Sequence, residues 1–173
     1  AVMGEEAGGL GSLYLCNAGL QADGAVVGEP TELALCTTHK GTYMRKVSFH
    51  GKAVHSARSR MGVNAIDHAV LFCEKYMKLQ EELGNHRHPI LGCADASVTL
   101  VSGGTRQNTI PENCWIMIDR RLLPGETHQK ADQELDAILS ELRKEICGLN
   151  VTVETIVATV PSETAPSERI VQC

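Results

Sequence analysis

Alternating polar and apolar positions mark the middle of the chain as a set of half-buried strands. In the segment GTYMRKVSF (41–49), every second residue from Tyr43 to Phe49 falls on one face, as it does in a strand with one side buried. Three further segments show the same alternation and predict three more strands: 94–104, 112–126 and 150–160.

Two other segments repeat their apolar residues at helical spacing. Residues 62–83 predict a long amphipathic helix, and a second helix is predicted between Thr127, a candidate N-cap, and Gly148. In the first helix, the residues expected to face the sheet are Ile66, Val70, Cys73, Tyr76 or Met77, and Leu83. In the second helix they are Ala131, Leu135, Ile138 or Leu139, Leu142 and Ile146.

The order of these elements predicts the fold class. From residue 38 to 160 the chain reads strand, helix, strand, strand, helix, strand. This is the split βαβ pattern of an α+β, ferredoxin-like two-layer sandwich, in which both helices cover one face of a four-stranded antiparallel sheet.

The first 31 residues predict a different kind of unit. A strand at 1–3, a helix closed by Gly19 and a short apolar run at 23–28 together resemble a strand, helix, strand unit of a parallel sheet. Residues 161–168, PSETAPSE, are typical of a linker.

Composition narrows the class of protein. With 173 residues, of which 43% are hydrophobic, the chain has material for one complete domain. The net charge of −5 argues against general binding to nucleic acid, and no apolar run approaches 18 residues, so no membrane span is expected. Seven cysteines without a CxxC pair predict buried thiols in a reducing compartment, and hence a cytoplasmic protein.

Carboxylates follow both predicted strands of the first unit. Glu5, Glu6 and Glu29 lie where such strands end, and residues at the carboxyl ends of neighbouring parallel strands converge. Adjacent carboxylates are stabilised by a divalent cation, which favours a metal site. A solvated acidic loop followed by a simple turn is the alternative.

Four motifs resemble one enzyme family. They are GEEAGGLG, VVGEPTEL, HKGTYMRKVSFHGKAVHSARSRMGVNAI and GGTRQNTIPENCWIMIDRRLLPGE, and they occur in that family's order and spacing. The family is that of the co-catalytic zinc metallopeptidases and deacylases, which contains acetylornithine deacetylase, succinyl-diaminopimelate desuccinylase, aminoacylase and glutamate carboxypeptidase. The residues of these motifs are most similar to those of the acetylornithine deacetylases.

The resemblance implies a two-zinc site, with cobalt as a substitute metal, that hydrolyses an amide bond. Glu5 would be the general base, and Glu6 and Glu29 would each bind one metal. None of the seven histidines is followed two residues later by aspartate, which is the pattern of the family's first metal ligands. The resemblance therefore implies a segment that is inactive alone.

The same resemblance implies three parts in this chain. Residues 1–36 would be a fragment of an α/β zinc-binding catalytic domain, residues 37–160 a lid domain that forms a homodimer, and residues 161–173 a linker that returns to the catalytic domain.

His50 and His55 flank a Gly-Lys turn, five residues apart, which is poor spacing for two ligands of one metal. The resemblance separates them. His55 matches a lid histidine that crosses the dimer interface and donates a hydrogen bond to the developing oxyanion, whereas His50 is expected to be a turn residue.

Two further positions match substrate-binding residues of the family. Asn108 lies where the family places an asparagine near the substrate, although a loop asparagine that bonds to its own backbone is an equal alternative. Arg121 matches an arginine that would hold a substrate α-carboxylate. Arg120 points to the opposite face by strand alternation and is expected to be a solvated charge.

Other polar clusters have less specific interpretations. His86-Arg87-His88 is expected to be a polar loop after a helix. Four basic residues are expected on one positive face that either steers anionic acyl-amino acids or is merely solvated: Arg45, Lys46, Arg58 and Arg60.

The favoured function is therefore the lid and dimerisation segment of a zinc-dependent amidohydrolase that removes an acyl group from an N-acyl amino acid, or cleaves a dipeptide. The alternative is a free-standing, non-catalytic ferredoxin-like module that dimerises or binds a small ligand.

Overall fold

The computed structural model describes residues 9–172, so Glu5, Glu6 and the strand predicted at 1–3 lie outside the described residues. The chain divides into two compact units. The larger one is Cys36–Pro166, and the smaller one combines the segment before Cys36 with the segment from Ser167 onward. Among the described residues, no helix combines the length and the apolar character needed to cross a membrane.

The smaller unit contains two helices, α1 (Leu10–Asn17) and α4 (Arg169–Gln172). Gly19 follows α1 with φ of 89°, a backbone conformation that favours glycine, and so ends the helix as predicted. The strand predicted at 23–28 is wrong, because this segment has no secondary structure. A buried strand needs neighbouring strands to satisfy its backbone, and none among the described residues pairs with it.

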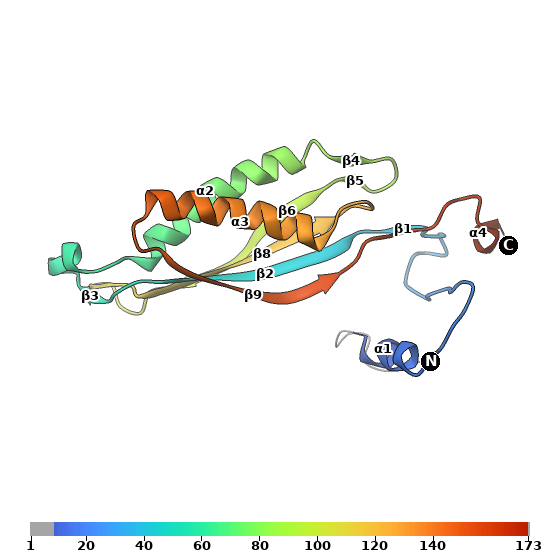
Figure 1. The fold of residues 1–173 in the computed structure, drawn as a ribbon, viewed down its shortest axis with the longest axis horizontal. Coiled ribbons are helices and arrows are strands. Elements are labelled where there is room, and N and C mark those ends of the chain that lie inside the picture. Colours follow the sequence, from blue (N-terminus) through green and yellow to red (C-terminus); the bar gives the residue numbers. More distant parts are fainter. Residues whose placement is uncertain (1–8, 173) are drawn as a thin grey trace. The chain divides into compact units, whose positions relative to one another are not determined.

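The larger unit is built on a four-stranded antiparallel sheet, as predicted. Its strands are β2 (Gly41–His50), β6 (Asp95–Gly103), β8 (Asn113–Leu122) and β9 (Asn150–Thr159). They lie in the order β6-β8-β2-β9 (Figure 1). Each crossover runs through a helix and skips one strand, which gives two interleaved split βαβ units.

Two helices, α2 (Ala65–Leu83) and α3 (His128–Glu145), cover one face of this sheet, and no other helix of the larger unit covers the opposite face (Figure 1). The Asn64 side chain caps α2 by accepting from the Ile66 amide at 3.0 Å. Thr127 caps α3 as predicted, with its hydroxyl oxygen 3.2 Å from the Lys130 amide nitrogen.

Shorter elements complete the larger unit. They are β1 (Thr38–His39), β3 (Val54–His55), the 3-10 helix η1 (Ser56–Met61), β4 (Arg87–His88), β5 (Gly92–Cys93), β7 (Thr109–Ile110) and β10 (Ser162–Glu163). Two predictions change as a result. The predicted linker contains β10, which pairs with β1, and His86-Arg87-His88 enters a short hairpin formed by β4 and β5.

The core lies between the helices and the sheet. The buried face of β2 is the predicted one, and α3 buries Ala131, Leu135, Ile138, Leu139 and Leu142, also as predicted. In α2 the buried residues are Ala65, Ala69, Phe72, Tyr76 and Leu83. Of the alternatives Tyr76 or Met77, Tyr76 is the buried one and Met77 is 51% exposed. Val70 was also expected in this stripe but is 59% exposed, because Phe72 and Tyr76 stack in the core and set the rotation of the helix.

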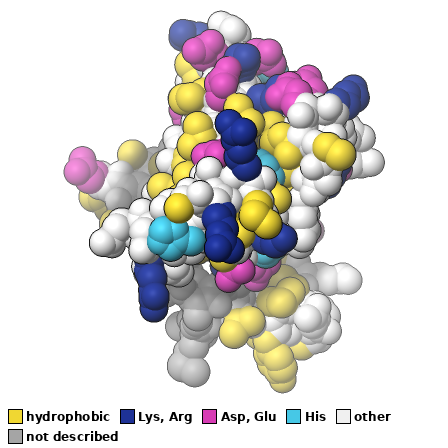
Figure 2. Space-filling model, turned by 90° about the vertical axis from the view of Figure 1, so that its left-hand side faces the viewer, with side chains coloured by type: hydrophobic (Ala, Val, Ile, Leu, Met, Phe, Trp, Pro, Cys, Tyr) yellow, Lys and Arg dark blue, Asp and Glu magenta, His cyan; other side chains and the backbone are white. Residues whose placement is uncertain are grey.

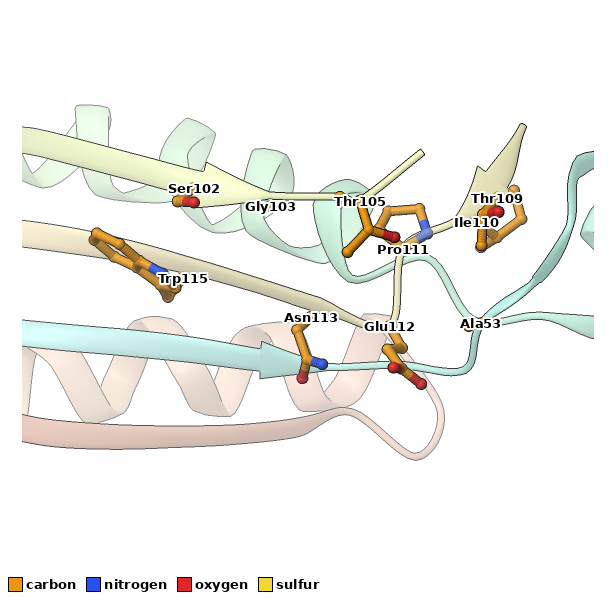
Figure 3. Close-up of a pocket in the computed structure, with 11 residues that line it drawn as sticks. Ala53, Ser102, Gly103, Thr105, Thr109, Ile110, Pro111, Glu112, Asn113 and Trp115 are labelled. Carbon is orange, nitrogen blue, oxygen red and sulfur yellow. The ribbon is translucent and has the colours of Figure 1, made fainter. Parts of the chain in front are cut away.

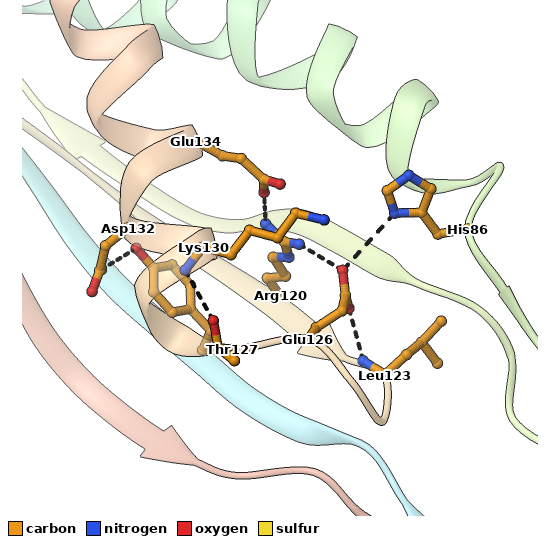
Figure 4. Close-up of polar contacts among 9 residues, drawn as sticks. His86, Arg120, Leu123, Glu126, Thr127, Lys130, Asp132 and Glu134 are labelled. Carbon is orange, nitrogen blue, oxygen red and sulfur yellow. Dashed lines mark hydrogen bonds and ion pairs between the residues drawn. The ribbon is translucent and has the colours of Figure 1, made fainter.

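Arg120 lies in this core and is not a solvated charge. Its side chain is 2% exposed and bonds to Glu126, with 2.8 Å between Nη2 and Oε1, and to Glu134 (Figure 4). Glu126 also accepts from the Leu123 amide at 2.8 Å. Alternation placed Arg120 on the helix-covered face, and carboxylates from a loop and from α3 neutralise its charge there.

The cysteine prediction is also only partly right. Of the six described cysteines, Cys114 is buried, Cys73 and Cys93 are partly exposed, and the rest are exposed: Cys16, Cys36 and Cys147. Burial raises the pKa of the Cys73 and Cys114 thiols, so both stay protonated at neutral pH and are poor nucleophiles.

Candidate functional site

The candidate site is at one end of the sheet, where two loops continue beyond β2 and β8. We call residues 51–64 and 104–112 together the loop end. There β3 pairs with β7 as a two-residue antiparallel ladder, with Val54 opposite Ile110 and His55 opposite Thr109. The ladder projects past the main sheet (Figure 1), so its side chains can reach another surface.

Two glycines allow the backbone of the loop end to close. The Lys52 amide donates to the Val63 carbonyl at 2.8 Å, and a Cβ on Gly51 would lie 2.1 Å from that same oxygen. A Cβ on Gly62 would lie 2.5 Å from the Val54 side chain. A Cβ at either position would clash, so both positions favour glycine. The Gly-Lys turn after His50 brings residues 52 and 63 within hydrogen-bond distance.

His55 is held by its own backbone neighbourhood. It is the N-cap of η1, and its Nδ1 accepts a hydrogen bond from the Ala57 amide at 3.2 Å. Since Nδ1 is the acceptor, the neutral ring carries its proton on Nε2. The side chain is exposed and its Nε2 makes no hydrogen bond with the described residues, so the Nε2–H group is available as a donor.

Asn108 lies beside His55. The Ser56 amide donates to the Asn108 carbonyl at 2.9 Å, which extends the ladder between β3 and β7 by one residue. The Asn108 side chain is exposed, and within the described residues it makes no hydrogen bond to its own backbone. The structure therefore brings the backbone segments of two predicted site residues next to each other, although they are more than fifty positions apart in sequence.

His50 is not part of this pair. Its ring bonds to Asn113 at 3.1 Å and to Thr152 at 3.2 Å, across the end of the sheet. It is a strand-end residue that ties β2 to both of its neighbours.

Two hollows adjoin the ladder. One, of about 200 Å³, opens on the helix-free face between the 103–113 loop and β8 (Figure 3). The chain's one tryptophan, Trp115, lies along it together with Asn113 and the Gly103-Gly104 backbone. The other, of about 500 Å³, is lined by Lys52, Val54, His55, Ala57, Arg58 and Met61. Sequence patterns predicted neither hollow, because both depend on how the two loops pair.

Arg121 lies far from this pair. It is eight residues from Asn113 along β8, which corresponds to about 27 Å of strand. Its guanidinium bonds to Asp119 at 2.9 Å and to the Thr42 hydroxyl at 3.2 Å, and its side chain remains 45% exposed. It faces the helix-free side, as alternation predicted. Within one chain, Arg121 cannot join His55 and Asn108 at one substrate.

The predicted positive face is also divided. Arg45 is 5% exposed, stacks on the Tyr43 ring at 3.8 Å and pairs with Asp132 under the helices. Lys46 is on the opposite face of β2, 5.0 Å from the Trp115 ring. Of the four residues predicted to form this face, only Arg58 and Arg60 belong to the loop end.

The described residues do not form a metal site. Glu29 is exposed in the smaller unit, and no group of three His, Cys, Asp or Glu side chains in residues 9–172 is arranged to hold a metal ion. The described donor set is therefore insufficient for zinc, and Glu5 and Glu6 lie outside it.

Comparison with known proteins identifies the larger unit. Residues 37–147 match the family model described as the peptidase dimerisation domain. The chain belongs to this family. The match includes both β3 and β7, so the loop end is part of the peptidase dimerisation domain, and it confirms the family that the four sequence motifs predict.

Relatives of this peptidase dimerisation domain are longer proteins. An acetylornithine deacetylase of Myxococcus xanthus is 33% identical over 144 residues, which cover 80% of this chain and 37% of that protein. One of Vibrio atlanticus is 36% identical over 150 residues, covering 82% of this chain and 39% of that protein. The chain thus spans less than half the length of these relatives.

A solved structure supports the fold. The aminopeptidase PepT of Bacillus cereus superposes with a TM-score of 0.71 at 21% identity, covering 99% of this chain and 44% of that one. At this identity the similarity shows the fold alone.

Proposed function

We propose that this chain is the lid and dimerisation part of a zinc-dependent amidohydrolase that removes the acyl group from an N-acyl amino acid, in the manner of an acetylornithine deacetylase. The names of the relatives and of the matched family support this proposal. The observation that carries it is a projecting ladder in which His55 lies opposite Thr109 and the next residue, Ser56, bonds to the Asn108 carbonyl.

His55 supplies the chemistry that the lid contributes. When water adds to an amide carbonyl, negative charge develops on the oxygen, and a hydrogen-bond donor placed in advance lowers the energy of that state. The Ala57 amide holds His55 in the tautomer whose exposed Nε2 donates. Asn108, one residue beyond the ladder, offers an amide group to the same substrate.

In a dimer, Arg121 of one copy can lie near His55 of the other, although the two residues are far apart within one chain. Strand β6 is an edge of the sheet and exposes Leu100 by 56% and Val101 by 66%. Helix α2 packs against β6 and exposes Val70 and Met77, so the helix and the edge strand both expose apolar side chains. Such an edge favours pairing with an identical edge.

This pairing has a consequence for the site. A twofold axis perpendicular to the sheet makes the two β6 strands antiparallel, so the loop end of one copy lies at the same end of the assembly as Arg121 of the other. We infer that His55 and Asn108 of one copy serve the same substrate as the partner subunit's Arg121, which binds the α-carboxylate.

The dimer is tested by sedimentation. Val101→Glu together with Val70→Glu should shift the chain from dimer to monomer, because both changes place charge among these exposed apolar side chains. Val153→Glu, on the opposite edge strand β9 where Val153 is 41% exposed, is the matched control and should remain dimeric. A wild-type monomer at high concentration, or equal effects of both variants, would contradict this interface.

The activity is tested in a longer protein that contains this chain together with a catalytic region. We expect hydrolysis of an N-acyl amino acid, about two zinc ions per chain, and loss of both hydrolysis and zinc when Glu6 or Glu29 is replaced by alanine. Glu5→Ala should keep the zinc but lose hydrolysis. The 173-residue chain alone should do neither. Absence of zinc and of hydrolysis in the longer protein would favour the non-catalytic ferredoxin-like module.

A donor role for His55 has its own signature. His55→Gln keeps a donor near the same place, whereas His55→Ala removes it, so kcat should fall by about 10²-fold or more for alanine and less for glutamine. His50→Ala is the control, because His50 bonds within the sheet and should affect stability without changing kcat.

A further inference from the structure

The loop end has an excess of positive charge that the proposed role of His55 does not use. Its two loops contain four basic side chains and one acidic one, in a chain whose net charge is −5: Lys52, Arg58, Arg60 and Arg106 against Glu112. None of the four forms an ion pair with a residue in the described part of the chain. Figure 2, viewed from this end, shows Lys, Arg and His side chains standing among hydrophobic ones.

Two of these four cations share a hollow with His55. Lys52 and Arg58 line the depression of about 500 Å³ together with His55, whereas Arg60 and Arg106 do not line it. The rest of its lining is apolar: Val54, Ala57 and Met61. This combination of apolar walls with a few convergent polar groups is typical of a small-molecule site, and the volume is in the usual range.

The backbone fixes the positions from which the two cations extend. Lys52 is held in a two-way bridge to Val63, with N to O distances of 2.8 and 3.1 Å. Arg58 is at the kink of η1, with φ of −122° and ψ of 30°, and it follows the cap that His55 forms. The side chains of Lys52, His55 and Arg58 therefore extend from one short segment, which the hydrogen bonds between Lys52 and Val63 close.

We propose that Lys52 and Arg58 form an anion subsite that selects substrates with a second carboxylate, in addition to the α-carboxylate assigned to Arg121. This inference rests on the proposed function. A substrate whose reacting carbonyl meets Nε2 of His55 places its neighbouring atoms in the same hollow, where Arg58 offers a planar fork and Lys52 a second charge. The second carboxylate belongs either to the acyl group or to the amino-acid side chain.

Binding to the 173-residue chain tests the subsite without catalysis. Nuclear magnetic resonance titrations would compare N-acetyl-L-glutamate with N-acetyl-L-glutamine, and N-succinyl-L-alanine with its terminal amide. These pairs place the extra charge in the side chain or in the acyl group. Exposed pairs of this kind are worth up to ~1 kcal/mol, so the acidic member of at least one pair should bind about fivefold more tightly.

Two variants of equal charge separate the subsite from a general field. Arg58→Gln should abolish the preference for the acidic probe, and Arg58→Lys should restore part of it. Arg60→Gln removes the same charge two residues away and should keep the preference. Equal binding of acid and amide, or equal loss of the preference in Arg58→Gln and Arg60→Gln, would overturn the proposal.

Kinetics in the longer protein distinguish this failure from failure of the proposed function. If the subsite is correct, Arg58→Gln lowers the ratio of kcat/KM for the acidic substrate to that for its amide. An equal fall for both substrates would show that the cations meet an acidic protein surface instead, and would overturn the proposal. A preference in binding without hydrolysis of any N-acyl amino acid would refute the amidohydrolase function and leave the anion subsite standing.

Discussion

Replacing Glu126 with glutamine should destabilise the larger unit more than any surface charge change of the same kind. Glu126 is 10% exposed and faces the guanidinium of Arg120, which is 2% exposed (Figure 4). Its other oxygen accepts from the Leu123 amide. Glutamine has the same shape and can keep that backbone bond, so the change removes mainly the negative charge.

The expected size follows from what remains around Arg120. Breaking a buried ion pair from one side costs about 3–5 kcal/mol, because the other charge is left without compensation. Here Glu134 still bonds to Arg120, and its side chain is 23% exposed. The loss in free energy of unfolding should therefore be smaller, about 2–3 kcal/mol. Glu74→Gln is the control, because Glu74 and Lys78 are 61% and 68% exposed and lie 3.8 Å apart. That change should stay within about 0.5 kcal/mol.

Urea unfolding followed by tryptophan fluorescence measures both variants. The single Trp115 is on β8, the same strand as Arg120, so the signal reports the larger unit. The midpoint should fall for Glu126→Gln while the slope stays constant, which shows a change in stability rather than in the exposed surface. A midpoint as high as that of the Glu74→Gln control would refute the view that Arg120 depends on Glu126.

Three further predictions concern the loop end and the buried groups. Gly51→Ala should destabilise the loop end, since its Cβ would lie 2.1 Å from a carbonyl oxygen. Gly84→Ala is the control and should fold normally, because the nearest atom to its Cβ would be 3.4 Å away. Amide hydrogen exchange in the loop end should be faster in Gly51→Ala than in Gly84→Ala. Iodoacetamide at pH 8 should label the exposed Cys147 quickly and Cys114 only after unfolding, because burial raises the pKa of Cys114; equal rates would contradict this. Burial, followed by its bond to Asp132, raises the pKa of Tyr43 above the usual 10.0, so the folded state keeps a proton that the unfolded state releases. Tyr43 should therefore contribute a loss of stability of about 1.4 kcal/mol per pH unit above pH 10, and a slope that is unchanged in Tyr43→Phe would refute this origin.

Local patterns determined much of the fold of the larger unit. Strand alternation alone predicts which face of β2 is buried, and helical spacing with a threonine cap predicts α3, because side-chain direction follows directly from backbone geometry. The order of the elements then leaves few topologies, of which the ferredoxin-like sandwich is the one observed. The motifs also identify the family, which the match over residues 37–147 confirms.

Other predictions failed where a partner distant in sequence decides the outcome. The apolar run at 23–28 predicts a strand, yet a strand forms only where another pairs with it. Alternation assigned Arg120 to the correct face but not to the interior, because its two carboxylate partners come from a loop and a helix. Val70 fits a helical stripe, but the aromatic packing of Phe72 and Tyr76 turns it outward.

The candidate site shows the same division. By itself, the sequence determined which residues are candidates: the motifs single out His55, Asn108 and Arg121, whose roles at an amide substrate stay predictions from the family resemblance. Only the tertiary structure decided that the backbone segments of His55 and Asn108 lie side by side while Arg121 lies at the other end of the sheet, and that Lys52 and Arg58 share a hollow with His55. The physical reason is that spacing along the chain sets the direction of a side chain, whereas the pairing of two distant loops sets which side chains become neighbours.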